Sequence, residues 1–429
     1  MRPFLSKAIA LGGVVVSLVL APVALAGSTL IKSERIVTNT GKPVTDKNIL
    51  VGEDGRLHFI AKSDTPADTE TLEGGSYWVT PGLFAPYATL GLVEVSGEHT
   101  TNNINSSNKQ ASVHIRAADS FNPKSTTIAV TRLGGITHAA VFPGNGETLF
   151  GGIGAVVNTT GGFDSVEKPD AFVYINLSGR SNVTGETKGA ALAFLRDALE
   201  DAAHYERRFK SPSDGNALRR ADAKALRPVV AGRMKLFIDA DQAIDIVNVL
   251  ALRKDWPLLD MVIVGGAEAW MVADRLAAAR VPVILDPMED LPYSFDQIAS
   301  RLDNAARLHK AGVEIAIMSR SGTGGGAHNL RLLPQHAGNA VTNGLDWDTA
   351  FAAITSVPAS LFGQNGLGVL QDGEKANLVV WDGDPLEVTS APVAIYIDGK
   401  RQSLVSRQTI LRDRYHPKHK REKPYGYQP

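Results

Sequence analysis

Carboxylate side chains that each follow an apolar run are the residues of this sequence best suited to chemistry. Asp239, Asp241, Glu268 and Asp286 all occupy such positions. Their oxygens could together form a hard site for Mg²⁺ or Ca²⁺. Asp241 also has a structural interpretation, because aspartate is a favoured N-cap and a helical pattern begins directly after it. The sequence leaves both interpretations open, and the cap is the simpler one.

A single histidine, His138, stands at the end of another apolar run, within Thr137-His138-Ala139-Ala140. Imidazole changes its charge near neutral pH, so His138 could act as a general base. A buried, hydrogen-bonded structural histidine is the alternative. The residue types alone do not separate the two roles.

Glycine is concentrated at positions 322 and 324–326, shortly before His328. Successive backbone amides in such a segment can form a nest that binds an anion. The segment lacks the strand-to-helix context of a phosphate-binding loop. A mobile loop beside the site is therefore the alternative interpretation.

These candidates need a scaffold, and the pattern around them is that of a parallel sheet covered by helices. Strand-like apolar runs alternate with amphipathic stretches that are typical of helices. The expected strands are 136–141, 172–175, 234–238, 261–264, 281–285 and 315–318, and the expected helices are 188–209, 241–252 and 267–279. A count of about eight runs, together with the length, favours a closed barrel over an open sheet.

Both ends of the chain, after the first residues, are predicted to form short strands joined by turns. Glu53-Asp54-Gly55 and Asp398-Gly399-Lys400 are two of these turns. Two β segments at opposite ends of a chain most simply form one unit. We therefore expect a composite β-sandwich from 28–78 and 365–411, with a barrel at 79–364 between its two parts.

The first 26 residues are typical of a secretory signal peptide. Arg2 and Lys7 flank an apolar run from Ala8 to Val23, and Ala24-Leu25-Ala26 forms a cleavage site. A membrane anchor is the alternative, but the small residues at the end of the run favour cleavage. We expect the protein to be exported to the periplasm or secreted, and not to be an integral membrane protein.

Composition excludes several classes of site. The sequence has no cysteine, which rules out disulfides, thiolate zinc sites and a cysteine nucleophile. A net charge of −1 lacks the basic excess of a nucleic-acid-binding protein. The segment 412–429 is locally basic and contains prolines, so we expect a disordered tail, with contact to an acidic partner or membrane surface as the alternative.

Five segments in a fixed order resemble the amidohydrolase superfamily, and in particular its imidazolonepropionase-like branch. They are Val79–Leu83, Arg132–His138, Ala340–Leu345, Ala353–Ala359 and Gly366–Leu378. The resemblance covers nearly all of the chain after the signal peptide. It implies a TIM-like (β/α)8 barrel beside a small β-sandwich, in agreement with the pattern of strands and helices.

Active members of this family use one or two divalent metals, which lower the pKa of a bound water and polarise the scissile amide. The resemblance places the family's first two histidines at Tyr87 and Thr89, and its later ones at Asp239 and Gly265. Its metal-binding aspartate falls at Ser319-Arg320. A guanidinium at Arg320 would repel a divalent cation. We therefore expect a degenerate metal site without a resident cofactor.

The residues around this position still indicate a ligand pocket at the carboxyl ends of the barrel strands. The candidate pocket residues are Tyr87, Thr89, Glu94, His138, Asp239, Gly265, Glu268, Asp286 and Arg320. Among them, His138, Asp239 and Glu268 are the candidate catalytic residues. No metal ligand is predicted.

The sequence therefore predicts an exported amidohydrolase-like protein. The ancestral activity would be hydrolysis of a non-peptide carbon–nitrogen bond in a cyclic amide or dipeptide-like substrate. The alternative is a non-catalytic protein that binds a small ligand or forms a heteromer with an intact amidohydrolase. A homo-oligomer is also compatible with the sequence, and so is a structural envelope protein with a filled barrel mouth.

Overall fold

A computed structural model describes residues 27–41, 44–74, 76–107, 111–144, 148–177, 187–210, 216–320 and 326–416. The signal-peptide prediction at 1–26 lies outside these residues, as does most of the glycine-rich loop at 321–325. In the described part, no helix is long and apolar enough to cross a membrane.

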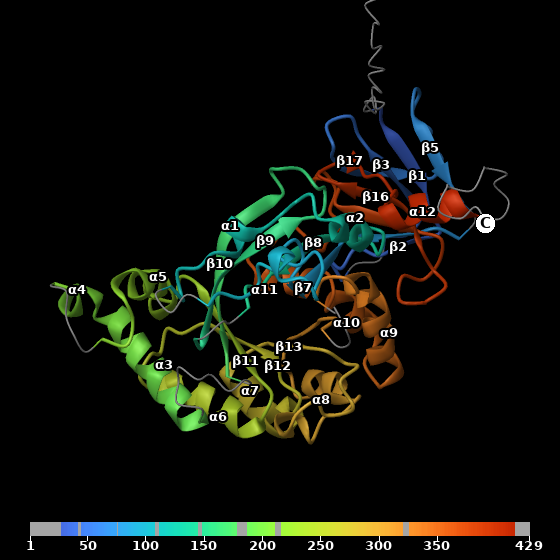
Figure 1. Ribbon diagram of the computed structural model, residues 1–429. Coiled ribbons are helices and arrows are strands. Elements are labelled where there is room, and N and C mark those ends of the chain that lie inside the picture. Colours follow the sequence, from blue (N-terminus) through green and yellow to red (C-terminus); the bar gives the residue numbers. More distant parts are fainter. Residues whose placement is uncertain are drawn as a thin grey trace, which may run out of the picture.

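An eight-stranded sheet forms the body of the protein (Figure 1), and it confirms the predicted α/β barrel class. Its strands, in spatial order, are β7 (Leu83–Ala88), β8 (Ile136–Val141), β9 (Phe150–Asn158), β10 (Val166–Asn176), β11 (Lys235–Ala240), β12 (Met261–Gly265), β13 (Val283–Leu285) and β14 (Ile315–Ile317). The last and first strands are joined through the segment at 353–354. Ile317 N–H donates to the Ala353 carbonyl at 2.9 Å, and Phe84 N–H donates to the Ile354 carbonyl at 2.8 Å.

One strand departs from the expected parallel pattern. β9 runs antiparallel to both β8 and β10. The connections at 142–149 and 159–165 are too short for the crossover that a parallel pair requires. β9 was absent from the sequence prediction because glycines interrupt its apolar pattern. Gly154 is required there, since a Cβ would overlap the ring of Phe172.

Helices pack against this sheet along its whole length. They are α1 (Ala117–Ser120), α2 (Thr126–Arg132), α3 (Lys188–Ala203), α4 (Tyr205–Arg208), α5 (Arg220–Val230), α6 (Ala243–Ala251), α7 (Ala273–Ala279), α8 (Asn304–Lys310), α9 (Leu333–Thr342), α10 (Trp347–Ala352) and α11 (Ser356–Leu361). Short 3₁₀ helices are η1 (His99–Thr101), η3 (Leu252–Lys254), η4 (Ala269–Val272), η5 (Phe295–Gln297) and η6 (Leu330–Leu332). α3 buries Leu192, Leu195 and Leu199 on one face, as its periodicity predicts.

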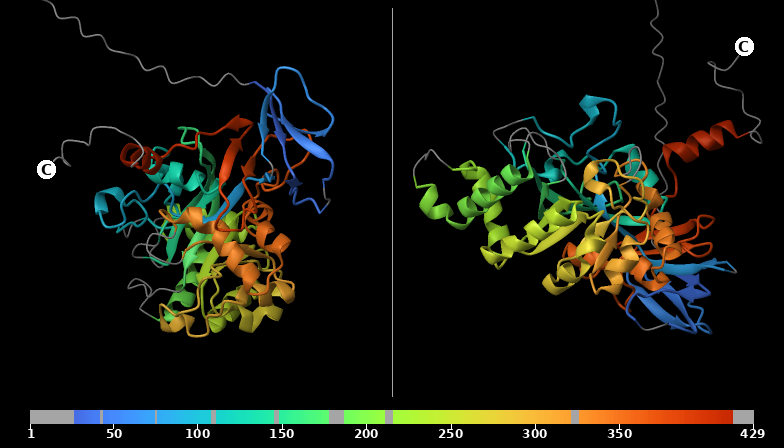
Figure 2. Two further views of the ribbon diagram at one scale, coloured as in Figure 1. Left: turned by 90° about the vertical axis from the view of Figure 1, so that its right-hand side faces the viewer. Right: turned by 90° about the horizontal axis from the view of Figure 1, so that it is seen from below.

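Strands from both ends of the chain pair in one sheet beside the barrel (Figure 2). That sheet has the order β17 (Lys400–Arg401), β16 (Pro392–Ile397), β15 (Leu378–Trp381), β6 (Trp78–Pro81) and β2 (Arg35–Ile36). A second sheet has the order β4 (Leu57–Ala61), β3 (Lys47–Val51), β1 (Thr29–Lys32) and β5 (Glu70–Glu73). Apolar side chains of both sheets, such as Ile49 and Val380, share one core. The exact domain boundaries stay a prediction.

The basic tail begins with a helix. α12 (Arg407–Tyr415) starts with a capping box between Ser406 and Thr409 and continues through 412–415. The prediction of disorder from 412 onward was therefore wrong for these four residues. The capping box lies before residue 412, so the charge pattern of the tail alone does not reveal the helix.

Aromatic rings fill the barrel interior. The ring centroids of Phe142 and Phe172 lie 4.4 Å apart, and those of Phe237 and Phe362 lie 4.8 Å apart. Together with Phe84 these rings belong to one buried cluster. The cluster separates the carboxyl ends of the strands from their amino ends, so side chains at the two ends belong to different sites.

Candidate functional site

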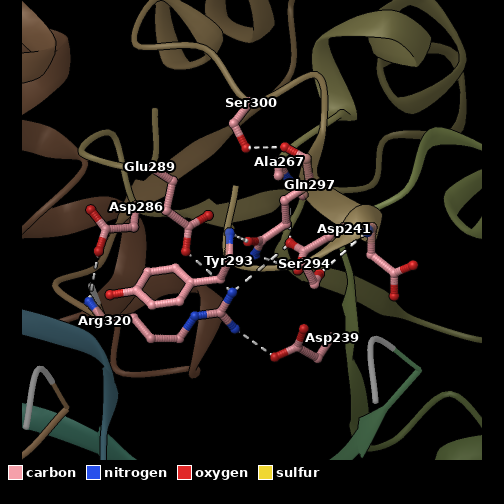
Figure 3. A network of polar contacts seen from close by, with 12 residues as sticks. Asp239, Asp241, Ala267, Asp286, Glu289, Tyr293, Ser294, Gln297, Ser300 and Arg320 are labelled. Atoms are coloured by element: carbon pink, nitrogen blue, oxygen red, sulfur yellow. Dashed lines mark hydrogen bonds and ion pairs between the residues drawn. The ribbon is translucent and has the colours of Figure 1, made fainter. Parts of the chain in front are cut away.

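Arg320 lies at the centre of the carboxyl end of the barrel (Figure 3). It follows β14, and its Nη1 lies 2.6 Å from Oδ2 of Asp239 at the end of β11. Tyr174, from β10, donates its hydroxyl to the same oxygen at 3.0 Å. The ring of Tyr87 faces the guanidinium, with its centroid 6.0 Å from Cζ. Four barrel strands thus contribute to one charged cluster.

Two further carboxylates face the other end of the guanidinium. Arg320 Nη2 lies 3.5 Å from Oε1 of Glu289 and 3.9 Å from Oδ1 of Asp241. Gln297 donates to Asp241 Oδ2 at 2.9 Å, and the backbone N–H of Ala267 donates to Asp241 Oδ1 at 3.3 Å. Asp239 and Asp241 can both face the site because Asp241 already lies beyond the end of β11.

The interpretation of Asp241 as a helix cap was wrong. Gln242 is the N-cap residue of α6. The Glu268 carboxylate accepts the backbone N–H of Ala243 at 3.1 Å and that of Ala299 at 3.4 Å. Glu268, a candidate catalytic residue, therefore supports the start of α6, and Asp241 belongs to the charged cluster.

Gly265, at the end of β12, has no side chain to occupy the space that Asp241 and Arg320 fill. Its φ is +87°, in the region that glycine adopts without strain. A Cβ there would overlap Asp241 Oδ1 and would lie 3.1 Å from Arg320 Nη2. The absence of a side chain at Gly265 thus lets Asp241 and Arg320 approach each other.

A buried relay holds the backbone of Arg320. Asp286 Oδ2 accepts the Arg320 N–H at 2.8 Å, and its Oδ1 lies 2.8 Å from His336 Nδ1. His336 Nε2 lies 3.2 Å from the Ser319 hydroxyl. The order serine–histidine–aspartate resembles a nucleophilic triad. Ser319 is only 1% exposed, however, so in this conformation the relay positions Arg320 and offers no nucleophile to a substrate.

Burial and charge shift several ionisation equilibria here. Burial acts to lower the pKa of Arg320, but the carboxylates of Asp239 and Glu289 outweigh it and raise this pKa well above its usual range. Burial also raises the pKa of Tyr174 well above its usual value, and Asp239 adds to this effect. Burial raises the pKa of Asp241 as well. The guanidinium is therefore a permanent charge.

Glu289 is the carboxyl group of the cluster that titrates near neutral pH. Burial raises its pKa from 4.5 to about 7; Arg320 opposes the shift, and Asp241 and Asp286 add to it. Its side chain is 10% exposed, so the shift is not screened away by solvent.

This shift predicts that the protein loses stability as pH rises. The folded state holds a proton on Glu289 that the unfolded state has released, so the contribution is complete below about pH 4.5 and is lost through about pH 7. At about 1.4 kcal/mol per pKa unit, the loss reaches up to about 3 kcal/mol. Urea unfolding of the wild type and Glu289→Gln across this window measures it. The variant is expected to be insensitive to pH by comparison, and parallel profiles would contradict the assignment.

Thr89 and Glu94 lie on the same side of the barrel but outside the charged cluster. The Thr89 N–H donates to the Gly326 carbonyl at 2.7 Å, close to Tyr87. The Glu94 carboxylate accepts hydrogen bonds from Ser125 and Thr126 at the start of α2. Burial acts to raise the pKa of Glu94, but these hydrogen bonds outweigh it and lower the pKa. Glu94 therefore supports a helix terminus.

His138 lies at the opposite end of the barrel from the other candidates. It pairs with Asn158 at the last residue of β9, and its Nε2 lies 3.2 Å from Glu167 Oε1. Its Nδ1 lies 2.9 Å from the Thr137 hydroxyl. This end has its own cavity of about 550 Å³, which His138 and Glu167 line. The structure thus does not bring His138 together with Asp239, and both ring nitrogens of His138 have a hydrogen-bond partner.

A divalent metal does not fit the residues at the carboxyl end. The described residues contain no group of three histidine, aspartate or glutamate side chains arranged to hold an ion. A guanidinium occupies the space between the carboxylates instead. The expected absence of a metal cofactor remains a prediction, because the fit of side chains does not measure metal content.

Four residues of the cluster were missed from sequence: Tyr174, Glu289, Gln297 and His336. Glu289 carried a usable signal, because it follows Asp286 closely after an apolar run. Gln297 and His336 come from η5 and α9, and only tertiary packing brings them to the strand ends.

Comparisons with known proteins agree with this architecture. The amidohydrolase family model matches residues 231–406. The chain is also similar to the amidohydrolase tasK of Hapsidospora irregularis, with 21% identity over 426 residues, covering 84% of this chain. The chain spans 40% of the length of that relative.

Solved structures share the fold. An amidohydrolase from Thermotoga maritima MSB8 matches with a TM-score of 0.76 and 22% identity, over 87% of this chain and 99% of that one. A prolidase bound to N-methylphosphonate-L-proline matches with a TM-score of 0.54 and 15% identity, over 89% and 100%. Molinate hydrolase matches with a TM-score of 0.53 and 14% identity, over 88% and 95%. Residues 231–406 thus carry the sequence pattern of the amidohydrolase family, and the solved structures share the barrel fold that the resemblance implies.

Proposed function

We propose that this protein is an exported amidohydrolase-like protein that no longer performs metal-dependent hydrolysis and instead binds a small ligand at the carboxyl end of its barrel. The observation that carries the proposal is the position of the Arg320 guanidinium, 2.6 Å from Asp239 and in reach of Asp241 and Glu289. The ancestral reaction would be that of the imidazolonepropionase-like branch, which is hydrolysis of a cyclic amide.

Electrostatics argues against the metal mechanism. That mechanism needs an ion with an open position for water and for the substrate carbonyl. A divalent cation beside Arg320 would meet a fixed positive charge, whose pKa is raised well above its usual range. The guanidinium is held through both its side chain and its backbone. Displacement of the guanidinium by a metal ion would therefore break these hydrogen bonds and cost free energy.

The same residue offers a way to bind an amide without cleaving it. The contacts of Nη2 to Glu289 and Asp241, at 3.5 and 3.9 Å, are long, and the side chain keeps 21% of its surface exposed. An N–H of Nη2 can therefore donate to the carbonyl oxygen of an incoming ligand. The ring of Tyr87 provides a flat apolar wall beside it. A small cyclic amide or dipeptide-like molecule matches these groups.

A hydrolysis and binding assay tests this function. Purified mature protein is incubated with cyclic amides, N-acyl amino acids and dipeptides, with and without a chelator, and ligand binding is followed by calorimetry. We expect binding that the chelator leaves unchanged and no metal-dependent turnover. An intact amidohydrolase assayed in parallel confirms that the substrates and the chelator work. Turnover that the chelator abolishes and zinc restores would contradict the proposal.

Association with another amidohydrolase chain is a second candidate role. Large apolar side chains are exposed on the segment that follows β13, namely Leu291, Tyr293, Phe295 and Ile298, at 80%, 80%, 85% and 62%. Clustered exposed apolar residues are typical of interaction surfaces. Light scattering of the protein, alone and co-expressed with an intact amidohydrolase of the same genome, tests it. We expect a complex that the double variant Leu291→Asp, Phe295→Asp loses, and a monomer in every sample would refute this role.

A further inference from the structure

Arg35 contacts two tryptophan rings where the β-sandwich meets the barrel. It belongs to β2, the edge strand of the five-stranded sheet. Its Cζ lies 4.1 Å from the ring centroid of Trp78 and 5.3 Å from that of Trp347. We propose that Arg35 and Asp348 form a second binding site, which takes a small zwitterion such as a free amino acid or a dipeptide. This site is independent of the function proposed for the carboxyl end of the barrel.

The two rings hold the guanidinium and leave its N–H groups available. An aromatic ring attracts a guanidinium through its face. Trp347 is itself fixed, because its Nε1–H donates to the two carboxylate oxygens of Asp384 at 3.1 and 3.0 Å. Among the described residues, no carboxylate pairs with Arg35 and no acceptor receives its side-chain N–H groups. A ligand carboxylate matches the paired N–H groups of such a guanidinium.

A cavity of about 610 Å³ lies beside the guanidinium. This volume is within the range of about 300–1,000 Å³ that is usual for small-molecule sites. Ile36 and Ala352 contribute apolar side chains to its wall, and Asn39 and Thr349 contribute polar ones. The cavity can therefore receive a small molecule that has both an apolar part and polar groups.

Asp348, in α10, supplies the opposite charge. It and Arg35 are the two charged side chains among the described residues that line the cavity. Neither of them forms an ion pair with the other or with a further described residue. An unpaired carboxylate accepts hydrogen bonds from an ammonium group. A single molecule that carries both a carboxylate and an ammonium group can thus pair with both side chains.

The cavity lies at the amino end of the barrel, away from Arg320. α10 leads directly to Ile354, whose carbonyl accepts the N–H of Phe84 near the start of β7. Asn39 donates to Thr355 Oγ1 at 2.7 Å, which connects the cavity wall to the same part of the barrel. Binding at this cavity can therefore be distinguished from binding at the carboxyl end.

Fluorine NMR of the protein labelled with fluorotryptophan tests the site, because two of its five tryptophans, Trp78 and Trp347, contact Arg35. L-leucine and glycyl-L-leucine are titrated separately to millimolar concentration. We expect at least one of them to cause saturable shifts of the Trp78 and Trp347 signals, with the signals of the other tryptophans unchanged. The probe that binds more tightly identifies the site as one for free amino acids or for dipeptides.

Derivatives that lack one charge show which side chain binds each end of the probe. The N-acetyl derivative lacks the ammonium group, and the amide derivative lacks the carboxylate. The wild type is expected to bind each derivative about tenfold more weakly than the probe, because each loses a charge-assisted hydrogen bond. Asp348→Asn is expected to bind the probe and its N-acetyl derivative with similar affinity. Arg35→Gln is expected to bind the probe and its amide with similar affinity.

Control variants separate binding from a structural role of Arg35. Arg401→Gln removes another guanidinium of the same sheet, which pairs with Glu70, and is expected to bind the probe like the wild type. Asp348 is exposed, so Asp348→Asn is expected to fold even if Arg35→Gln does not. The proposal is overturned if neither probe shifts the Trp78 and Trp347 signals, which is also the result expected if both probes bind only at Arg320. It is equally overturned if Asp348→Asn still discriminates against the N-acetyl derivative.

Discussion

Replacement of Asp239 by asparagine is expected to lower the free energy of unfolding by about 3 kcal/mol, since breaking a buried ion pair leaves a charge without its main partner. Asp239 Oδ2 lies 2.6 Å from Arg320 Nη1, and the side chain of Asp239 is 5% exposed. Glu289 and Asp241 remain near the guanidinium, which keeps the loss at the lower end of the range for such pairs. Urea unfolding at neutral pH measures the difference.

Asp303→Asn is the matched control for this variant. Asp303 pairs with Arg301 and Arg307, and its side chain is 35% exposed. Exposed ion pairs contribute about 0.2–1 kcal/mol, so the same chemical change is expected to have a small effect there. Equal effects of the two substitutions would show that the pair of Asp239 and Arg320 behaves as a surface pair. The guanidinium would then not be the centre of the site.

Gly265→Ala is expected to destabilise the protein by about 3 kcal/mol. Part of this loss comes from placing a Cβ at a φ of +87°, which costs about 1–2 kcal/mol. The rest comes from overlap of the Cβ with Asp241 Oδ1, which Ala267 and Gln297 hold in place. The same unfolding measurement applies.

Gly312→Ala separates these two contributions. Gly312 has a φ of +85°, and its Cβ would meet no described atom within 4 Å. It therefore carries the backbone strain without the overlap, and we expect a loss of about 1–2 kcal/mol. A Gly265→Ala variant that is no less stable than Gly312→Ala would mean that Asp241 moves freely. The close approach of Asp241 and Arg320 would then be no requirement of the fold.

Much of the fold could be predicted because apolar runs and helical periodicity are local signals. The predicted strand at 136–141 matches β8, and the predicted helix from 188 matches α3. β9 was missed because Gly151, Gly152 and Gly154 interrupt its run of apolar side chains. Each of these glycines lies so close to a neighbouring residue that a Cβ would overlap it. The antiparallel direction of β9 follows from the short connections at 142–149 and 159–165. Those connections are defined only when the bounds of β9 are known.

The candidate site was predicted in part. Tyr87, Asp239, Gly265 and Arg320 do lie together, because residues at the ends of parallel strands meet at one edge. The alternation of side chains along a strand places His138 inside the barrel, but it does not say at which end. The pairing of His138 with Asn158 of β9 decides that question. A strand missing from the prediction thus accounts for the misplaced histidine.

Anomalous scattering at the zinc edge, from crystals grown with excess ZnCl₂, tests directly whether the barrel centre holds a guanidinium in place of a metal. We expect no anomalous peak between Asp239, Asp241 and Glu289, and continuous density for Arg320 in contact with Asp239. A well-occupied zinc peak among these carboxylates, with Arg320 displaced from them, would contradict the central claim.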